Sequence, residues 1–126
     1  MTDARVWTVE DHLRDADPAA VELWHRIDEL IRSFGPVTHS VAKTTITFKG
    51  PRRGFAGFRP WRAGVRGYFD LMRELPPDPR VLSASPYGRR LFVHQLRLAD
   101  AGEFDEAVAA WLREAYDVGC GAHLGP

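Results

Sequence analysis

The stretch "VAKTTITFKGPRRGFAGFRPWRAGVRGYF" spans Val41–Phe69, and the alternation of apolar and polar residues along it decides the fold. Alternation over Val41–Lys49, rich in β-branched residues, predicts a single strand with Thr44, Ile46 and Phe48 on its core-facing side. Turn signals at Gly50–Gly54 and Pro60–Gly64 then separate it from two further predicted strands, Phe55–Arg59 and Val65–Leu71. Three strands so closely spaced favour an antiparallel meander.

The sequence before this meander predicts two helices. Thr8 is a residue type that caps helix N-termini, and acidic residues follow it, so a short helix begins there. Asp17 followed by Pro18 begins a longer helix, whose apolar residues recur at helical spacing until Gly35 ends it.

The sequence after the meander predicts one more strand and one more helix. Alternation over Arg89–Leu98 predicts the fourth strand, and Asp100 with Glu103 forms a capping-box pattern that begins the final helix. Residues 80–86 fit either a helical turn or a short strand. We therefore expect an α+β fold, in which helices cover one face of a single antiparallel sheet of about four strands, in the order α-α-β-β-β-β-α.

The length of 126 residues predicts a single domain, 1–126, whose Gly-rich end at 119–126 we expect to be a flexible tail. No apolar run is long enough to cross a membrane, and residues 1–5 show no signal segment. Cys120 is the only cysteine, which excludes an internal disulfide and favours the cytoplasm. The sequence does not distinguish a monomer from a homodimer.

Charge is distributed unevenly along a chain whose formal net charge is zero. Residues 30–69 hold eight basic residues and no Asp or Glu, whereas residues 1–29 and 100–126 are both acidic. Overall neutrality argues against strong nucleic-acid binding, so the charge blocks, rather than the net charge, indicate a partner.

Several short motifs give the chain a resemblance to a known family. They are Trp7–His12, Gly35–Val37, Lys43-Thr44, Gly54–Ala56, Tyr87–Arg89, His94 with Leu96–Leu98, and Trp111–Tyr116. The chain resembles, over roughly residues 6–118, a family of small bacterial domains of unknown function. It also looks like a distant relative of YdhG-like proteins, some of which carry a frataxin-type iron-chaperone label. The resemblance implies a compact α+β domain. An iron chaperone would present clustered carboxylates, which residues 30–69 lack.

The central basic block predicts a binding surface for an anion. Guanidinium and ammonium groups neutralise phosphates, and aromatic rings stack on bases, so a nucleotide or nucleic acid fits this composition. Two alternatives stay open: the charges are balanced by the acidic segments, or they meet an acidic protein partner. The candidate binding residues are Lys43, Thr44, Arg52, Arg53, Phe55, Arg59, Arg62, Tyr68 and His94.

His94 is the candidate catalytic residue of a second hypothesis. It lies between Phe92 and Leu96 on the strand face that we assign to the core, where a histidine is either satisfied by hydrogen bonds or active in a cleft. With Lys43 and Thr44, whose part rests mainly on the resemblance, it would form the pocket of a small enzyme.

Other chemical signatures are missing from the sequence. There is no GxSxG motif, no phosphate-binding loop, and no CxxC or HxxxH pair, so we expect neither a bound metal nor a cofactor. The sequence therefore favours a binding domain over an enzyme.

Overall fold

The computed structural model describes residues 6–125 and confirms the α+β class. The helices are α1 (Val9–Leu13), α2 (Pro18–Phe34) and α3 (Glu106–Gly119), and short 3-10 turns lie at Ala101–Glu103 and Ala122–Leu124. The strands are β1 (Thr38–Val41), β2 (Ile46–Lys49), β3 (Gly54–Trp61), β4 (Gly64–Leu71), β5 (Val81–Pro86) and β6 (Phe92–Leu98). The expectations about residues 1–5 and Pro126 lie outside the described residues.

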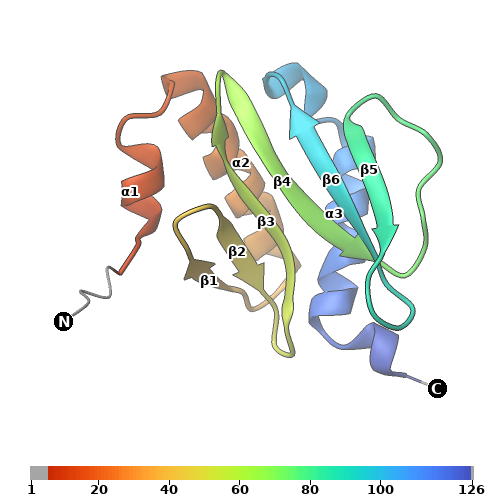
Figure 1. Ribbon diagram of the computed structural model, residues 1–126. Helices are drawn as coiled ribbons and strands as arrows, with labels where there is room; N and C mark the ends of the chain where they lie inside the picture. The colour runs from red at the N-terminus through yellow and green to blue at the C-terminus, as the bar shows by residue number, and fades with distance from the viewer. Residues whose placement is uncertain (1–5, 126) are drawn as a thin grey trace.

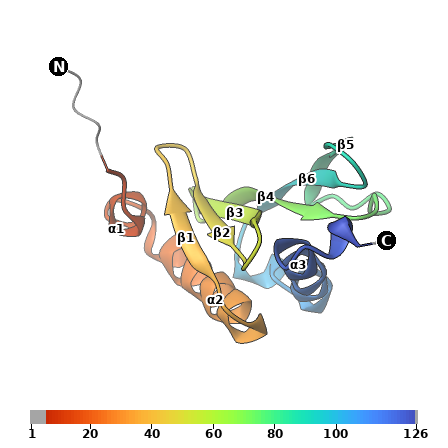
Figure 2. The same cartoon turned by 90° about the horizontal axis from the view of Figure 1, so that it is seen from below.

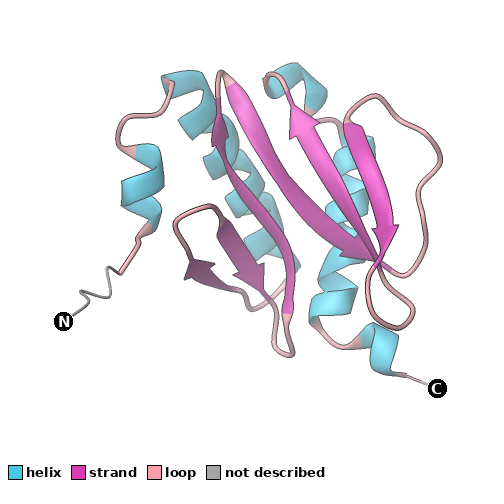
Figure 3. Cartoon of the chain, in the orientation of Figure 1, coloured by secondary structure: helices cyan, strands magenta, loops and turns pink. Residues whose placement is uncertain are grey.

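All six strands belong to one antiparallel sheet, in the order β1-β2-β3-β4-β6-β5 (Figure 1). Figure 2 shows α2 and α3 on the same face of this sheet, and Figure 3 shows the strands as one layer in front of the helices. The short helix α1 lies at the side, where the His12 imidazole Nε2 is 2.7 Å from the Ala42 carbonyl oxygen. Among residues 6–125, no helix therefore covers the opposite face of the sheet.

The predicted helix starts in the first third of the chain are confirmed. The Thr8 hydroxyl accepts a hydrogen bond from the Asp11 amide (3.1 Å), and the Asp11 carboxylate accepts one from the Thr8 amide. At α2 the Asp17 carboxylate accepts a hydrogen bond from the Ala19 amide (2.8 Å), and Pro18 is the first helical residue. These side chains satisfy amides that the first turn of a helix leaves unpaired.

The prediction of one strand over residues 41–49 is wrong. The segment contains a turn, closed by a 2.9 Å hydrogen bond from the Ala42 amide to the Thr45 carbonyl, and Val41 lies opposite Ile46 in the resulting β1–β2 hairpin. Thr44 consequently lies exposed in the turn rather than facing the core. The turn residues are Ala, Lys and Thr, none of which is a turn-favouring Gly, Pro, Asn or Asp, so the strand pattern continues through them.

Two other element predictions need correction. Residues 81–86 form the edge strand β5, so the sheet has six strands instead of about four. Asp100 caps only the 3-10 turn, and α3 begins at Glu106, where the Asp105 carboxylate accepts a hydrogen bond from the Val108 amide (3.1 Å). Part of the expected tail forms the 3-10 turn Ala122–Leu124, and Arg90 donates a hydrogen bond to the His123 carbonyl, whereas the flexibility of residues 119–126 stays a prediction.

The core lies between the sheet and the two long helices. Its largest fully buried side chains are Trp24 on α2 and the phenylalanines of β2, β3 and β4: Phe48, Phe55, Phe58 and Phe69. The indole of Trp24 donates a 3.0 Å hydrogen bond to the Phe58 carbonyl, which ties α2 to β3. Burial of these aromatic side chains drives the helices onto one face only.

Within residues 6–125, the helices are too short or too polar to cross a bilayer.

Candidate functional site

The helix-free face of the sheet brings three arginines into a row. Arg59 on β3 lies directly opposite Arg66 on β4, and Arg66 lies directly opposite Arg97 on β6. Neighbouring residues such as Phe58, Val65 and the leucines of β6 turn toward the helices, so strand alternation turns the three arginines to the other side. Arg66 and Arg97 are exposed.

This arginine row has no acidic partner in the part of the chain that the structure describes. None of the ion pairs of residues 6–125 involves Arg59, Arg66 or Arg97. Like charges directly opposite each other on neighbouring strands are destabilising. The sheet therefore carries a repulsive arrangement at this position, and an anion bound there would relieve it.

The indole of Trp61, at the end of β3, contacts three arginines of the open face. The guanidinium carbon of Arg62 lies 4.5 Å from the Trp61 ring centroid, and those of Arg66 and Arg97 lie at 5.8 and 5.7 Å. Cation–π contacts of this kind orient guanidinium groups without neutralising them. The arginines are thus positioned while their hydrogen-bond donors stay available.

Tyr68 lies next to the arginine row on the same face. An added Cβ on Gly57, the residue opposite Tyr68, would come within 2.6 Å of the tyrosine ring, so only glycine lets this ring lie flat across β3. The Tyr68 hydroxyl lies 3.3 Å from the Thr47 hydroxyl. Burial raises the pKa of the Tyr68 phenol, so it stays a neutral donor and acceptor near pH 7.

Beyond Tyr68 the face is hollowed into a pocket of about 590 Å³. We call it the Asp70 pocket, and its main lining residues are Arg53, Tyr68, Asp70, Tyr87, Val93 and Gln95. Its size lies within the range of pockets that hold small molecules, and polar and aromatic groups converge in it.

Asp70 is the most unusual group of this pocket. It is the only Asp or Glu in the six strands, and it is only 3% exposed. Burial raises the pKa of its carboxyl to about 6, although the positive charge of Arg53 lowers it in part. An Arg53 Nη2–H donates to Asp70 Oδ2 across 3.2 Å, and the Arg53 guanidinium also lies 5.7 Å from the Tyr87 ring centroid.

The structure does not bring all the predicted binding residues together. Lys43 and Thr44 lie in the exposed β1–β2 turn, and Arg52 lies exposed at the opposite end of β3 from Arg62. Phe55 belongs to the core, where its ring meets Tyr116 edge-on at 5.5 Å. The single basic surface that the sequence predicts over residues 43–66 is therefore divided among both ends and the middle of the sheet.

His94 is sealed beneath the helices rather than exposed in a cleft. Its Nδ1–H donates to the Phe92 carbonyl (3.1 Å), and its Nε2 accepts from the Leu75 amide (3.1 Å). The imidazole stacks on the Phe69 ring with centroids 5.1 Å apart, and burial lowers the pKa of His94. Strands β3 and β4 separate it from the hairpin that carries Lys43 and Thr44, so these three residues form no common pocket.

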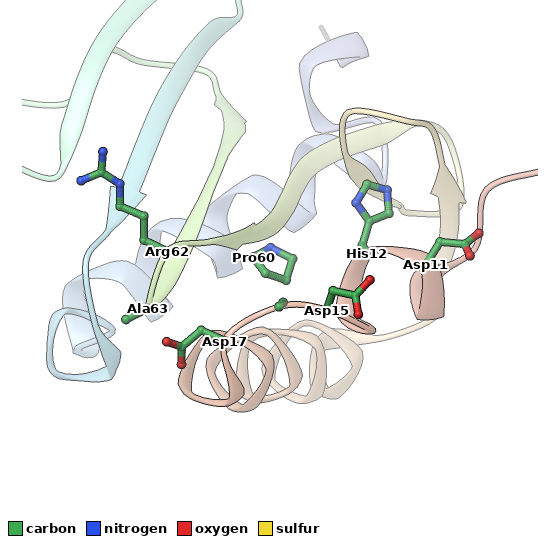
Figure 4. A pocket seen from close by; sticks show the side chains of 8 residues that line it. Asp11, His12, Asp15, Asp17, Pro60, Arg62 and Ala63 are labelled. Atoms are coloured by element: carbon green, nitrogen blue, oxygen red, sulfur yellow. The ribbon is translucent and has the colours of Figure 1, made fainter.

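A second hollow, also about 590 Å³, lies between α1 and the β3–β4 turn (Figure 4). Two of its three acidic side chains, Asp11 and Asp17, accept hydrogen bonds from backbone amides at the starts of α1 and α2, and Figure 4 shows the Arg62 guanidinium pointing away from them. Over residues 6–125, no group of three or more His, Cys, Asp or Glu side chains is placed to hold a metal ion. Two of the acidic side chains in this hollow therefore already serve the helix starts.

Sequence reasoning missed several residues of the open face. Its candidates do not include Trp61, Arg66, Asp70, Gln95 and Arg97. Strand alternation alone already places Arg66 with Asp70 on one face of their strand, and Gln95 with Arg97 on one face of theirs. The alternation does not reveal that β4 pairs with β6, and it is this pairing that places the residues of the two strands side by side.

Comparison with known proteins identifies the family. The model of a family described as "Domain of unknown function (DUF5655)" matches residues 9–119, so the chain belongs to that family. The resemblance to a domain of unknown function is thereby confirmed, whereas the match does not extend to YdhG-like or frataxin-type proteins. Comparisons with curated proteins and with solved structures gave no match.

Proposed function

We propose that this member of a family without an assigned activity binds nucleoside phosphates on the open face of its sheet. The ligand is either a free nucleotide or a nucleotide unit of single-stranded RNA or DNA, since the two share the same phosphate and base chemistry. The arginine row of Arg59, Arg66 and Arg97 is the observation that carries this proposal.

The arginine row fits phosphate for a chemical reason. Each guanidinium presents several N–H donors in a planar fork that matches a phosphate group, and its charge persists at any physiological pH. Three such groups lie on adjacent strands, and no carboxylate of residues 6–125 pairs with them. They therefore give a locally positive surface on a molecule of zero net charge.

Aromatic side chains on the same face fit the base of such a ligand. Trp61 lies at one side of the arginine row, and Tyr68 lies flat at the other. Open sheet faces that combine stacking rings with basic residues are a general solution for single-stranded nucleic acid. Because the net charge is zero, we expect moderate affinity and little long-range attraction.

The test measures binding of a short fluorescent single strand at about 50 mM and about 200 mM salt, by anisotropy. If the three arginines contact phosphates, affinity falls roughly twentyfold over this range. Arg66→Glu removes most of the binding. Arg113→Glu is the matched control, because Arg113 lies exposed on α3, on the helix-covered side. Its contacts, an ion pair with Asp117 and cation–π contacts with Phe34 and Tyr116, all lie away from the open face.

Competition separates the two sources of the ligand. Displacement by a nucleoside diphosphate indicates a mononucleotide site, and displacement only by unlabelled single strands indicates nucleic acid. Three results would overturn the proposal: no binding at low salt, equal loss in the Arg66 and Arg113 variants, or stronger displacement by an acidic peptide than by either nucleotide competitor. The last result would indicate the acidic protein partner instead.

A further inference from the structure

We propose that the Asp70 pocket receives the base of the bound nucleotide and selects guanine. This inference rests on the proposed function, because it assigns the base end of a ligand whose phosphates lie on the arginine row. Nothing in the family match assigns a role to this pocket or to Asp70.

The first observation is that only one of the two carboxylate oxygens of Asp70 has a hydrogen-bond partner among residues 6–125. Its Oδ2 accepts from Arg53, but no hydrogen bond from residues 6–125 reaches Oδ1. Oδ1 is unpaired but not fully enclosed, and Asp70 lines the pocket, so Oδ1 is the carboxylate oxygen left to accept from a ligand there. A nearly buried carboxylate with an acceptor oxygen facing a cavity indicates a ligand with hydrogen-bond donors.

The second observation is that burying the Asp70 carboxylate costs free energy. Every other position in the six strands avoids Asp and Glu, and burying a carboxylate is unfavourable unless its oxygens are well paired. Arg53 offsets this cost only in part, since its guanidinium also donates to the Gly54 carbonyl and rests against Tyr87. A ligand that donates to Oδ1 would complete the pairing.

Guanine fits this carboxylate better than the other bases do. A carboxylate only accepts hydrogen bonds, and guanine presents two neighbouring donors, N1–H and the 2-amino group, on its Watson–Crick edge. Adenine and cytosine place a ring-nitrogen acceptor beside their amino donor, and uracil flanks its single N–H with two carbonyls. Each of these bases would direct a lone pair at the carboxylate.

The surroundings of Asp70 fit an aromatic ring and its phosphate. Tyr68 and the exposed ring of Tyr87 line the pocket and offer stacking surfaces, and the Gln95 amide is able to donate to the guanine carbonyl. Arg66 lies four residues before Asp70 on the same face of β4, about 13 Å away along the strand. Because the arginine side chain is long, its guanidinium group is able to extend toward Asp70. The remaining distance between guanidinium and carboxylate is one that a nucleoside diphosphate can bridge.

The test compares GDP, IDP and ADP as ligands, by calorimetry at about 50 mM salt. IDP differs from GDP only by lacking the 2-amino group, so the comparison isolates one donor. We expect GDP to bind about tenfold more tightly than IDP, the usual effect of one hydrogen bond to a charged acceptor, and ADP to bind more weakly still.

Asp70→Asn provides the matching variant, because it keeps the shape of the side chain and removes its charge. We expect the preference for GDP over IDP to disappear, while the dependence of binding on Arg66 persists. The wild-type comparison needs no variant, so the inference stays testable if Asp70→Asn fails to fold.

The outcomes distinguish this inference from the proposed function. Equal affinities for GDP, IDP and ADP, together with loss of binding in Arg66→Glu, overturn guanine selection and leave phosphate binding in place. A preference for GDP that persists in Asp70→Asn overturns the role of Asp70. Absence of binding by every nucleotide and single strand overturns both proposals.

Discussion

Arg66 lies directly opposite Arg97 on the neighbouring strand, with Arg59 on its other side, and no carboxylate of residues 6–125 pairs with any of the three. Such an arrangement lowers stability, because like charges face each other across adjacent strands. Binding sites commonly contain arrangements of this kind, in which a ligand supplies the missing charge. The row therefore predicts that stability and binding respond to mutation in opposite directions.

Arg66→Glu tests this opposition. The substitution replaces two repulsive cross-strand pairs by two attractive ones, so we expect the free energy of unfolding to rise by about 0.5–1 kcal/mol at low salt. The gain shrinks at high salt, because these exposed charges are screened. Urea denaturation at both salt concentrations measures it. Arg66→Gln removes the charge without reversing it, so its unfolding free energy should lie between those of wild type and Arg66→Glu. A loss of stability in Arg66→Glu would show that the arginine row is not repulsive.

Asp70→Asn tests the buried carboxyl. The folded-state pKa of about 6 exceeds the unfolded value of 3.8, so the folded protein binds the proton more tightly. The contribution of Asp70 is therefore most favourable near pH 4 and is lost as pH rises through 6. Relative to wild type, Asp70→Asn should gain on the order of 2–3 kcal/mol in unfolding free energy between pH 4 and pH 7.5.

The measurement for Asp70 is a series of urea unfolding curves across this pH range. Asp117→Asn serves as the control, because Asp117 also pairs with an arginine, Arg113, but lies exposed on α3. A parallel pH profile of Asp70→Asn and wild type would show that Asp70 titrates as an ordinary surface carboxyl does.

Gly57→Ala tests the flat position of Tyr68. The new methyl group would lie 2.6 Å from the Tyr68 ring and 3.1 Å from the Thr45 hydroxyl, so the ring must move away from β3. We expect a loss of roughly 1–3 kcal/mol in unfolding free energy, typical of overpacking, and weaker binding of single strands. Gly88→Ala is no suitable control, because Gly88 has a positive φ of 62°. Gly102→Ala is better, since only the Asp100 carboxylate lies near.

The elements of this fold were predictable wherever local chemistry determines them. Asp17-Pro18 defines the start of α2, and the alternation after Val65 defines β4, because capping and strand periodicity act between near neighbours. The β1–β2 turn escaped prediction, since Ala42–Thr45 lacks turn-favouring residues and its bend is stabilised by the pairing of the two strands.

The candidate site was less predictable than the fold, because it depends on pairing between distant segments. Arg66 and Arg97 become neighbours only through the β4–β6 register. Asp70 reaches Arg53 only because the β3–β4 pairing places the start of β3 beside the end of β4. Alternation assigned each residue to a face but gave no order of strands. His94 illustrates the same limit, since its partner Leu75 lies in a loop whose position no pattern indicates.

His94→Phe and His94→Gln test whether His94 is structural. Phe removes the acceptor of the Leu75 amide and the donor to the Phe92 carbonyl, so we expect a loss of about 2–4 kcal/mol in unfolding free energy. Gln retains an acceptor and a donor and should lose less. Because His94 is sealed on the helix side of the sheet, nucleotide affinity of both folded variants should equal that of wild type.

The pH dependence of the His94 variants gives a second, independent measurement. Burial lowers the folded-state pKa of His94 below the ordinary value of 6.5, so the unfolded chain binds the proton more tightly. Its contribution is therefore fully present above pH 6.5 and is lost as pH falls below that value, opposite in sign to that of Asp70. His94→Phe should consequently lose less stability than wild type between pH 7 and pH 5. An unchanged pH profile combined with weaker nucleotide binding would contradict the structural role and restore His94 as a candidate for the site.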